Sequence, residues 1–234
     1  MRKLLIVFVC ILTLGTALAW GDSSPKEQLD KANNIINEIM RTPDQGIPNN
    51  LLNQAVCVGI IPSEVKFAFG FGGRYGRGVL VCRKHGNGAW SAPSLFTLGG
   101  GSFGFQIGGK ATDVVFIVMN PGGAQKLLQS KVKLGAGVSV AAGPVGRSAG
   151  SATDLQLHAE ILSYSRSRGL FAGVALKGAV MTQDSDDNEK LYGRAVNPED
   201  ILIKGTVAAP VAARPLDRTL TKYSPHGGAP FANN

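Results

Sequence analysis

Two overlapping glycine patterns have the spacing of phosphate-binding loops. Residues 99–104 carry the Gly-x-Gly-x-x-Gly spacing of a dinucleotide-binding loop, and residues 104–110 come close to a P-loop. Both loops need their glycines between a strand and a helix, but across 102–108 Phe and Ile alternate with Ser, Gly and Gln, as in a strand. Ala111 also stands where a P-loop has Ser or Thr. We therefore expect no nucleotide site and interpret the glycines as marks of strong curvature, bulges or close backbone approach.

A group of oxygen-bearing side chains has part of the spacing of a calcium-binding loop. Asp184, Asp186 and Asn188 stand at the first three ligand positions of such a loop. However, Glu189 takes the place of the usual glycine, and Ala195 takes the place of the bidentate glutamate. We expect a solvated acidic hairpin turn here, with calcium binding as the alternative.

Residues suited to hydrolytic chemistry are scarce. The chain has three histidines, His85, His158 and His226, and neither a Gly-x-Ser-x-Gly elbow nor an HExxH motif. A Ser–His–Asp site assembled from distant segments stays open. These histidines and two widely spaced cysteines do not provide the usual ligands of zinc. We expect no enzymatic activity, no cofactor and no metal.

The first 19 residues have the pattern of a secretory signal peptide, with two cations, an apolar run and a small-x-small site that ends at Ala19. We expect cleavage there and an exported protein, periplasmic or secreted; a membrane anchor is the alternative. Cys57 and Cys82 would then remain in an oxidising compartment. They either pair as a disulfide, which we favour, or stay buried as free thiols.

The middle of the chain is strongly basic. Residues 65–153 hold ten basic side chains and one acidic side chain, Asp113. Such a segment presents a positive field wherever its cations share a surface. The expected counterparts are anionic lipid head groups or envelope polyanions, whereas an exported protein would not meet nucleic acid. Cations scattered for solubility are the alternative. The candidate lipid-binding residues are Lys66, Arg74, Arg77, Lys110, Lys131, Lys133 and Arg147.

The N-terminal region predicts an amphipathic helix over residues 25–40, with Ser24 as its N-cap. Its apolar side chains, among them Leu29, Ile36 and Met40, would face either the domain or a membrane. The polar face carries balanced charges, whereas membrane-surface helices are usually rich in Lys and Arg. Packing on the domain is therefore favoured, and a membrane-facing helix is the alternative.

The rest of the chain favours strands. Glycine-laced strands are expected between residues 56 and 183, with short helices near 48–55, 121 and 198. From residue 208 onward Pro, Gly and Ala are mixed without apolar periodicity, which indicates a disordered or loosely docked tail over 208–234. The predicted fold is α+β, one domain over residues 20–207 in which N-terminal helices pack on a curved, glycine-rich antiparallel sheet or partial barrel.

A set of motifs, in this order, resembles the SYLF domain family, which includes the yeast Las-binding actin regulators and many exported bacterial members. They are RYGRGVLVCR, GNGAWSAPSLFTLGGGSFGFQIGG, TDVVFIVMN, LGAGVSVAAGPVGR, ILSYSRSRGLFAGVALKGAVM and DNEKLYG. The resemblance implies a lipid-binding module, because eukaryotic members are described as binding phosphoinositides and bending membranes. Some yeast members are also described as binding and bundling actin.

The cations and the resemblance together lead us to expect a non-catalytic module that binds anionic phospholipid, phosphoinositide-like head groups or a membrane surface. The alternative is a structural or protein-interaction module of the cell envelope, with actin binding confined to the eukaryotic relatives. The identity of the lipid and the oligomeric state stay open.

Overall fold

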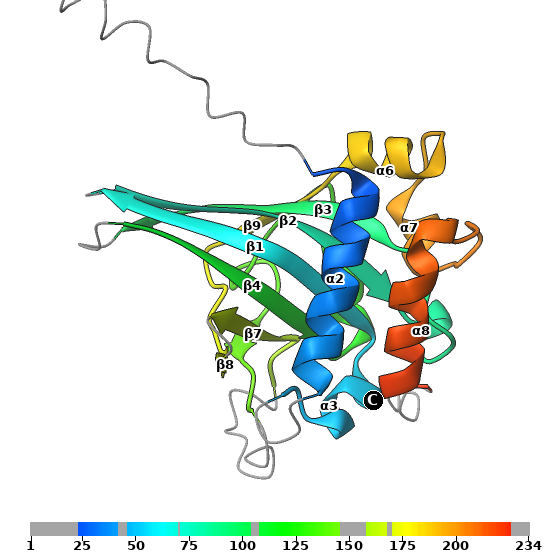
Figure 1. The fold of residues 1–234 in the computed structure, drawn as a ribbon, viewed down its shortest axis with the longest axis horizontal. Coiled ribbons are helices and arrows are strands. Elements are labelled where there is room, and N and C mark those ends of the chain that lie inside the picture. The colour runs from blue at the N-terminus through cyan, green and yellow to red at the C-terminus, as the bar shows by residue number, and fades with distance from the viewer. Residues whose placement is uncertain are drawn as a thin grey trace, which may run out of the picture.

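The computed structural model describes residues 23–41, 46–69, 71–103, 108–145, 158–167 and 170–225. Helices near both ends of this part of the chain pack on one large sheet (Figure 1). The strands are β1 (Cys57–Phe69), β2 (Phe71–Cys82), β3 (Ser94–Phe103), β4 (Gly108–Val118), β5 (Lys131–Lys133), β6 (Val140–Ala142), β7 (Ile161–Ser167), β8 (Leu170–Gly173) and β9 (Val180–Gln183). The helices are α2 (Pro25–Met40), α3 (Asn49–Gln54), α4 (Pro121–Leu127), α6 (Ser185–Tyr192), α7 (Pro198–Leu202) and α8 (Arg214–Tyr223), with 3-10 turns η1 (Lys84–Gly86) and η3 (Val211–Ala213). The predicted α+β class is confirmed.

The sheet follows the order β5-β9-β3-β2-β1-β4-β7-β6, with β8 paired to β7. It is strongly curled, and β1 to β4 extend beyond the helices in Figure 1. All strand pairs are antiparallel except β6–β7. The expected antiparallel sheet is therefore mixed, because a connection of more than a dozen residues between β6 and β7 allows a parallel crossover.

Each face of the sheet carries its own apolar core. The outer face, defined by Val58 and Ile60, packs against α2 and α8. The inner face, defined by Phe96 and Phe116, packs against α4 and α7. Paired residues of neighbouring strands share a face, so the strand register assigns every residue of β1 to β4 to one of the two.

Some of the strand glycines make room for aromatic rings on the inner face. A Cβ atom on Gly59 would overlap the ring of Phe116, and one on Gly78 would overlap the ring of Phe96. The two rings meet edge to face, with 5.8 Å between their centroids. Gly99 and Gly101 lie within β3, as the alternation predicts, while residues 104–107 lie outside the described part. Close packing thus accounts for Gly59 and Gly78, in agreement with the expected close backbone approach.

Helix α2 begins as predicted and packs on the sheet. The Ser24 side chain accepts a hydrogen bond from the backbone N–H of Glu27 at 3.2 Å, and Pro25 occupies the first turn. Five of its buried positions form the apolar stripe that faces the outer side of the sheet and α8: Leu29, Ala32, Ile35, Ile36 and Ile39. Gln28, also buried, donates instead to the Asp187 carboxylate of α6 at 3.2 Å.

The prediction of a disordered or loosely docked tail from residue 208 is wrong for η3 and α8. Leu216 and Leu220, one helical turn apart, are buried against α2. The hydroxyl of Thr219 donates to Asn33 Oδ1 at 2.7 Å, which ties α8 to α2. These two leucines suffice to dock α8, because α2 and the sheet already provide the apolar surface that the leucines cover. Residues 226–234 lie outside the described part.

The acidic run at residue 184 is the start of a helix rather than a solvated hairpin turn. Asp184 caps α6, because its carboxylate accepts from the N–H of Asp187 at 3.1 Å. Asp187 and Asn188 are buried, and Asn188 Oδ1 accepts from the N–H of Leu95 at 2.8 Å. Burial raises the pKa of Asp184. Carboxylates favour a helix N-terminus, so the run stabilises α6. Asn188 Oδ1 is thus already engaged, and the calcium alternative has no support here.

Candidate functional site

Three of the predicted cationic residues stand in a row across the inner face of the sheet. Lys66 on β1 is paired directly with Arg74 on β2 and with Lys110 on β4. Directly paired residues have Cβ atoms about 5 Å apart and point to the same side of the sheet. The register therefore brings together three side chains that are far apart in the sequence. We call Lys66, Arg74 and Lys110 the basic row.

A single buried carboxylate faces the basic row. Glu64, fully buried, lies on the same face, with its Oε2 3.3 Å from Lys66 Nζ and its Oε1 3.6 Å from Arg74 Nη1. Neither oxygen has a hydrogen-bond partner among the described residues, nor has the neighbouring Thr112 hydroxyl. One negative charge thus compensates three positive charges only in part, and the row keeps a local excess of positive charge.

A β-bulge turns Glu64 and Lys66 toward the inner face. Between Ile61 and Glu64 the register of β1 shifts against β4, and Ser63 takes a positive φ of 54°. The Asp113 carboxylate accepts from the N–H of Ser63 at 3.0 Å and so holds the bulge. Burial raises the pKa of Asp113, while this N–H acts to lower it. Bulges that redirect a side chain are common beside functional sites.

Space for Glu64 comes from the opposite strand. A Cβ atom on Gly76 of β2 would meet Ile61 and would lie 3.5 Å from Glu64 Cβ. The bulge at Ser63 therefore turns Glu64 inward, and Gly76 leaves room for its side chain. Sequence reasoning missed Glu64, since an isolated acid in an apolar strand gave no signal.

The remaining predicted lipid-binding residues do not join the basic row. Arg77 lies on the outer face and is ion-paired with Asp187 at the start of α6, so it supports the fold. Lys131 and Lys133 are exposed on β5, with side chains on the outer face. Arg147 lies outside the described residues. The structure therefore separates the cations into two groups on opposite faces.

The alternative of a membrane-facing N-terminal helix disagrees with the structure. Leu29 and Ile36 are buried, and Met40, which is partly buried, packs against the same core. The sheet and α8 cover the apolar stripe because it matches their own apolar surface. Among the described residues, no helix combines the length and apolar character needed to cross a bilayer.

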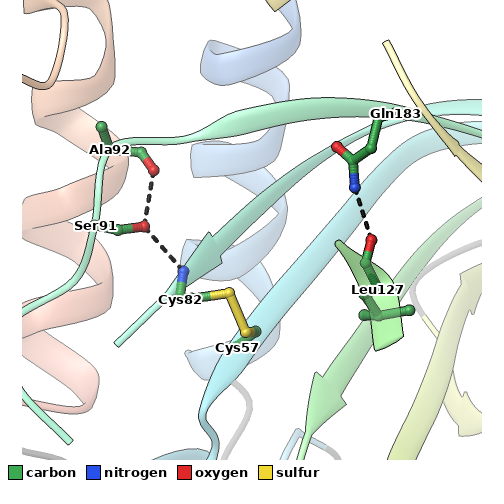
Figure 2. Close-up of a disulfide and its surroundings, with 6 residues drawn as sticks. All are labelled: Cys57, Cys82, Ser91, Ala92, Leu127 and Gln183. Carbon is green, nitrogen blue, oxygen red and sulfur yellow. Dashed lines mark hydrogen bonds between the residues drawn. A yellow bond between two sulfur atoms is a disulfide. The ribbon is translucent and has the colours of Figure 1, made fainter. Parts of the chain in front are cut away.

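The two cysteines of the described part meet across β1 and β2. Cys57 and Cys82 are direct partners in the register, both buried, with their Sγ atoms 2.07 Å apart, as in a disulfide (Figure 2). The backbone N–H of Cys82 also donates to the Ser91 hydroxyl at 3.1 Å (Figure 2). The pair closes the end of the inner core opposite to the basic row.

Two of the three histidines lie in the part of the chain that the structure describes. His85 lies in the 3-10 turn after β2 with a φ of 56°, and His158 lies three residues before the start of β7. Within the part that the structure describes, no three His, Cys, Asp or Glu side chains are placed to hold a metal ion. His226 lies outside that part.

Comparison with known proteins identifies the family. Residues 99–223 match the Ysc84 family, which is described as "Las17-binding protein actin regulator". The chain belongs to this family. The match includes β4 and therefore Lys110 of the basic row. The resemblance to the SYLF and yeast Las-binding proteins that the motifs indicated is thereby confirmed.

Several relatives resemble most of this Ysc84-family chain. An SH3 domain-containing protein of Schizosaccharomyces pombe is 37% identical over 206 residues, which are 85% of this chain and 47% of that protein. LAS seventeen-binding protein 3 of Saccharomyces cerevisiae is 38% identical over 192 residues, 79% of this chain and 41% of that protein. SH3 domain-containing YSC84-like protein 1 of Homo sapiens is 32% identical over 208 residues, 86% of this chain and 60% of that protein. The chain spans about half the length of these relatives.

Proposed function

We propose that this chain is a non-catalytic protein-binding module of the actin-regulator type and that the basic row contacts an acidic surface of its partner. The observation that carries the proposal is the alignment of Lys66, Arg74 and Lys110 in one row, in which only the first two are paired with a carboxylate, that of Glu64. The family description and the name of the relative LAS seventeen-binding protein 3 both point to protein partners.

The physical argument concerns uncompensated charge. Like charges at directly opposed positions destabilise a sheet, and a partner that supplies carboxylates would relieve that repulsion. Lys110 is exposed and Lys66 is half-buried, so both can reach a partner, whereas Arg74 is more deeply placed and would orient it. Long-range attraction between the row and an acidic surface would mainly raise the association rate and would weaken with salt.

Co-sedimentation with actin filaments tests the proposal. We expect wild-type protein to pellet with filaments at low salt and less at physiological salt. Lys66→Glu combined with Lys110→Glu should weaken binding by at least about tenfold, because two attractive contacts become repulsive. Lys131→Glu combined with Lys133→Glu, the same change on the outer face, is the matched control and should bind like wild type. Wild-type protein that stays in the supernatant at both salt concentrations would contradict the actin proposal.

Anionic lipid is the second candidate partner, since the basic row also suits phosphate head groups. Each cation near an anionic bilayer contributes about 1 kcal/mol, so three would suffice for weak docking. Vesicles of phosphatidylcholine with and without phosphatidylserine, tested with the same two double variants, distinguish the surfaces. If the Lys66→Glu, Lys110→Glu variant loses vesicle binding and the Lys131→Glu, Lys133→Glu variant does not, the basic row is the lipid-binding surface. Equal binding to both vesicle types would count against a head-group site.

As an alternative that excludes an encounter with actin, we propose that the chain is exported after cleavage behind Ala19, that its partner is then a protein of the cell envelope, and that Cys57 and Cys82 form a disulfide in the mature protein. The direct pairing of Cys57 with Cys82 in the strand register and the burial of both residues support the disulfide. Intact mass of the secreted protein should show a chain that begins at Trp20 and lacks two hydrogens. A mass increase after alkylation without reductant would mean free thiols and would contradict the disulfide.

A further inference from the structure

Strand β4 runs on beyond its neighbour β7. The last pair between them is Asp113 with Arg166, whereas β4 pairs with β1 as far as Gly108. Residues 108–112 are therefore paired on one side only, and in the described part of the chain no strand lies on the other side. An unpaired strand edge is a template for another strand.

The register shows which backbone groups face this open edge. The N–H of Met119 donates to the carbonyl of Glu160 on the β7 side at 2.8 Å. In an antiparallel ladder the backbone groups of alternate residues point to the same side. The bulge adds its extra residue to β1 and none to β4. The backbone groups of β4 therefore keep pointing alternately to the β1 side and the β7 side. Counting by twos from Met119, Asp113, Ala111 and Gly109 face the β7 side, and the last two have no strand partner there.

A hollow of about 860 Å³ lies along this edge. One wall is the β4 segment Gly109, Lys110 and Ala111, all exposed; the other is formed by residues of β7 and β8. Leu170 in the second wall is 70% exposed, an unusual exposure for a large apolar side chain. The hollow thus combines free backbone groups, a cation and an apolar contact.

We propose that the edge of β4 at Gly109 and Ala111 binds an extended acidic segment of a partner protein, which adds a strand to the sheet. This inference rests on the proposed protein-binding function and names the partner's chemistry. The backbone N–H and C=O groups of both residues pair with the added strand, and alternate side chains of that strand give specificity.

Charge selects the acidic residue of the added strand. Lys110 points to the inner face between the two edge-facing residues, beside Lys66 and Arg74. The residue of the partner strand next to Lys110 on that face meets a positive field, so Asp or Glu fits there. The following position on the same face can hold an apolar side chain over Leu170, which lines the same hollow. The recognised pattern is an acidic residue followed, two positions along, by an apolar one.

The test uses the full chain and a fluorescein-labelled peptide in which Thr-Glu-Thr-Leu is repeated twice, followed by fluorescence anisotropy. Ala111→Pro removes the edge-facing N–H and leaves the pairing of β4 with β1, since proline is tolerated where the N–H faces away from the sheet. Ala111→Ser keeps the N–H and is the matched control. We expect saturable binding to wild type and Ala111→Ser, and at least about tenfold weaker binding to Ala111→Pro.

Two further measurements make the result decisive. A peptide N-methylated at alternate residues should lose binding to wild-type protein, so strand addition is tested even if Ala111→Pro does not fold. Lys110→Gln should weaken the peptide several-fold, as expected for loss of one charge pair. Equal binding by Ala111→Pro and Ala111→Ser, or no saturable binding to wild type, would overturn the inference. Filament binding by wild type that is insensitive to Ala111→Pro would leave the proposed function intact while the strand addition fails.

Discussion

Lys66, Arg74 and Lys110 weaken the sheet by standing opposite one another, and Glu64 limits that cost. Paired like charges are destabilising, and a buried carboxylate without hydrogen bonds carries a desolvation penalty of its own. Lys66 and Arg74, however, are both ion-paired with Glu64, and each offsets part of the cost of burying that carboxylate. An acidic ligand would neutralise the positive charge that Glu64 leaves uncompensated, which is why we assign the binding function to the basic row.

Removal of the Glu64 charge should destabilise the protein. Glu64→Gln leaves Lys66 and Arg74 without their counter-charge, and loss of one partner of a buried ion pair typically costs roughly 3 kcal/mol. Urea unfolding should therefore show a lower free energy of unfolding for Glu64→Gln. Lys66→Met in the same background removes one of the repelling cations and should recover part of the loss. A single variant as stable as wild type would show that Glu64 does not compensate the row.

Gly59 should tolerate no side chain. A methyl group at this position overlaps the ring of Phe116, and overpacking of this kind costs about 1–3 kcal/mol. Gly59→Ala should therefore lower the melting temperature. Gly101→Ala in β3 is the control, because its added Cβ would have its nearest neighbour 4.0 Å away. Equal melting temperatures for the two variants would refute the ring-over-glycine packing.

At the scale of elements, α8 depends on one buried arginine. Arg83, at the end of β2, donates from Nη2 to the carbonyl of Ser224 at 2.8 Å, and its guanidinium lies 3.9 Å from the centre of the Trp90 ring. Burial lowers the pKa of Arg83 to about 10, so the group stays charged at neutral pH. The contact satisfies a carbonyl beyond the last turn of α8 and fixes that helix on the sheet.

Replacement of Arg83 should loosen α8. Arg83→Met leaves the Ser224 carbonyl unpaired, and a hydrogen bond to a charged group contributes about 2 kcal/mol. Hydrogen exchange should accelerate in residues 214–223 before it does in β1 or β2. Arg218→Met, an exposed arginine on α8, is the control and should change little. Unchanged exchange in α8 of the Arg83 variant would mean that the apolar contacts of Leu216 and Leu220 suffice.

The helices that carry strong local signals were predictable. Ser24 caps α2 as the spacing indicates, and the short helix expected near residue 198 is α7, because capping and an N-terminal proline are local signals. In contrast, α8 was missed, since two leucines one turn apart give a weak periodic signal. Their burial depends on the surface of α2, which is more than 170 residues away in the sequence.

The candidate site was only partly predictable, and the bulge explains why. Up to Ile61 the odd-numbered residues of β1 face inward, but after the extra residue the even-numbered ones do. Strict alternation would therefore place Lys66 on the outer face. A bulge is set by contacts between strands, here by the Asp113 carboxylate on the Ser63 N–H, and no pattern within β1 reveals it. The basicity of the segment was predictable, whereas the alignment of three cations was not.

At the scale of the whole molecule, the outer face of the sheet stabilises the fold, and we assign binding to the inner face. The outer face is covered by α2 and α8, and its apolar core holds these helices on the sheet. The inner face is apolar and closed near Cys57 and Cys82, and polar and basic at the other end of β1 and β2. Because β1 to β4 extend beyond the helices in Figure 1, the basic end lies where a partner can reach it.

Hydrogen exchange of the full chain with and without actin filaments tests this account most directly. We predict slower exchange in peptides that cover residues 64–76 and 108–112, which carry the basic row and the open edge of β4. Peptides that cover Lys131 and Lys133 on the outer face should exchange at the same rate in both samples. Protection confined to α2, α8 or β5, or no protection anywhere under conditions that saturate pelleting, would contradict the basic row as the binding surface.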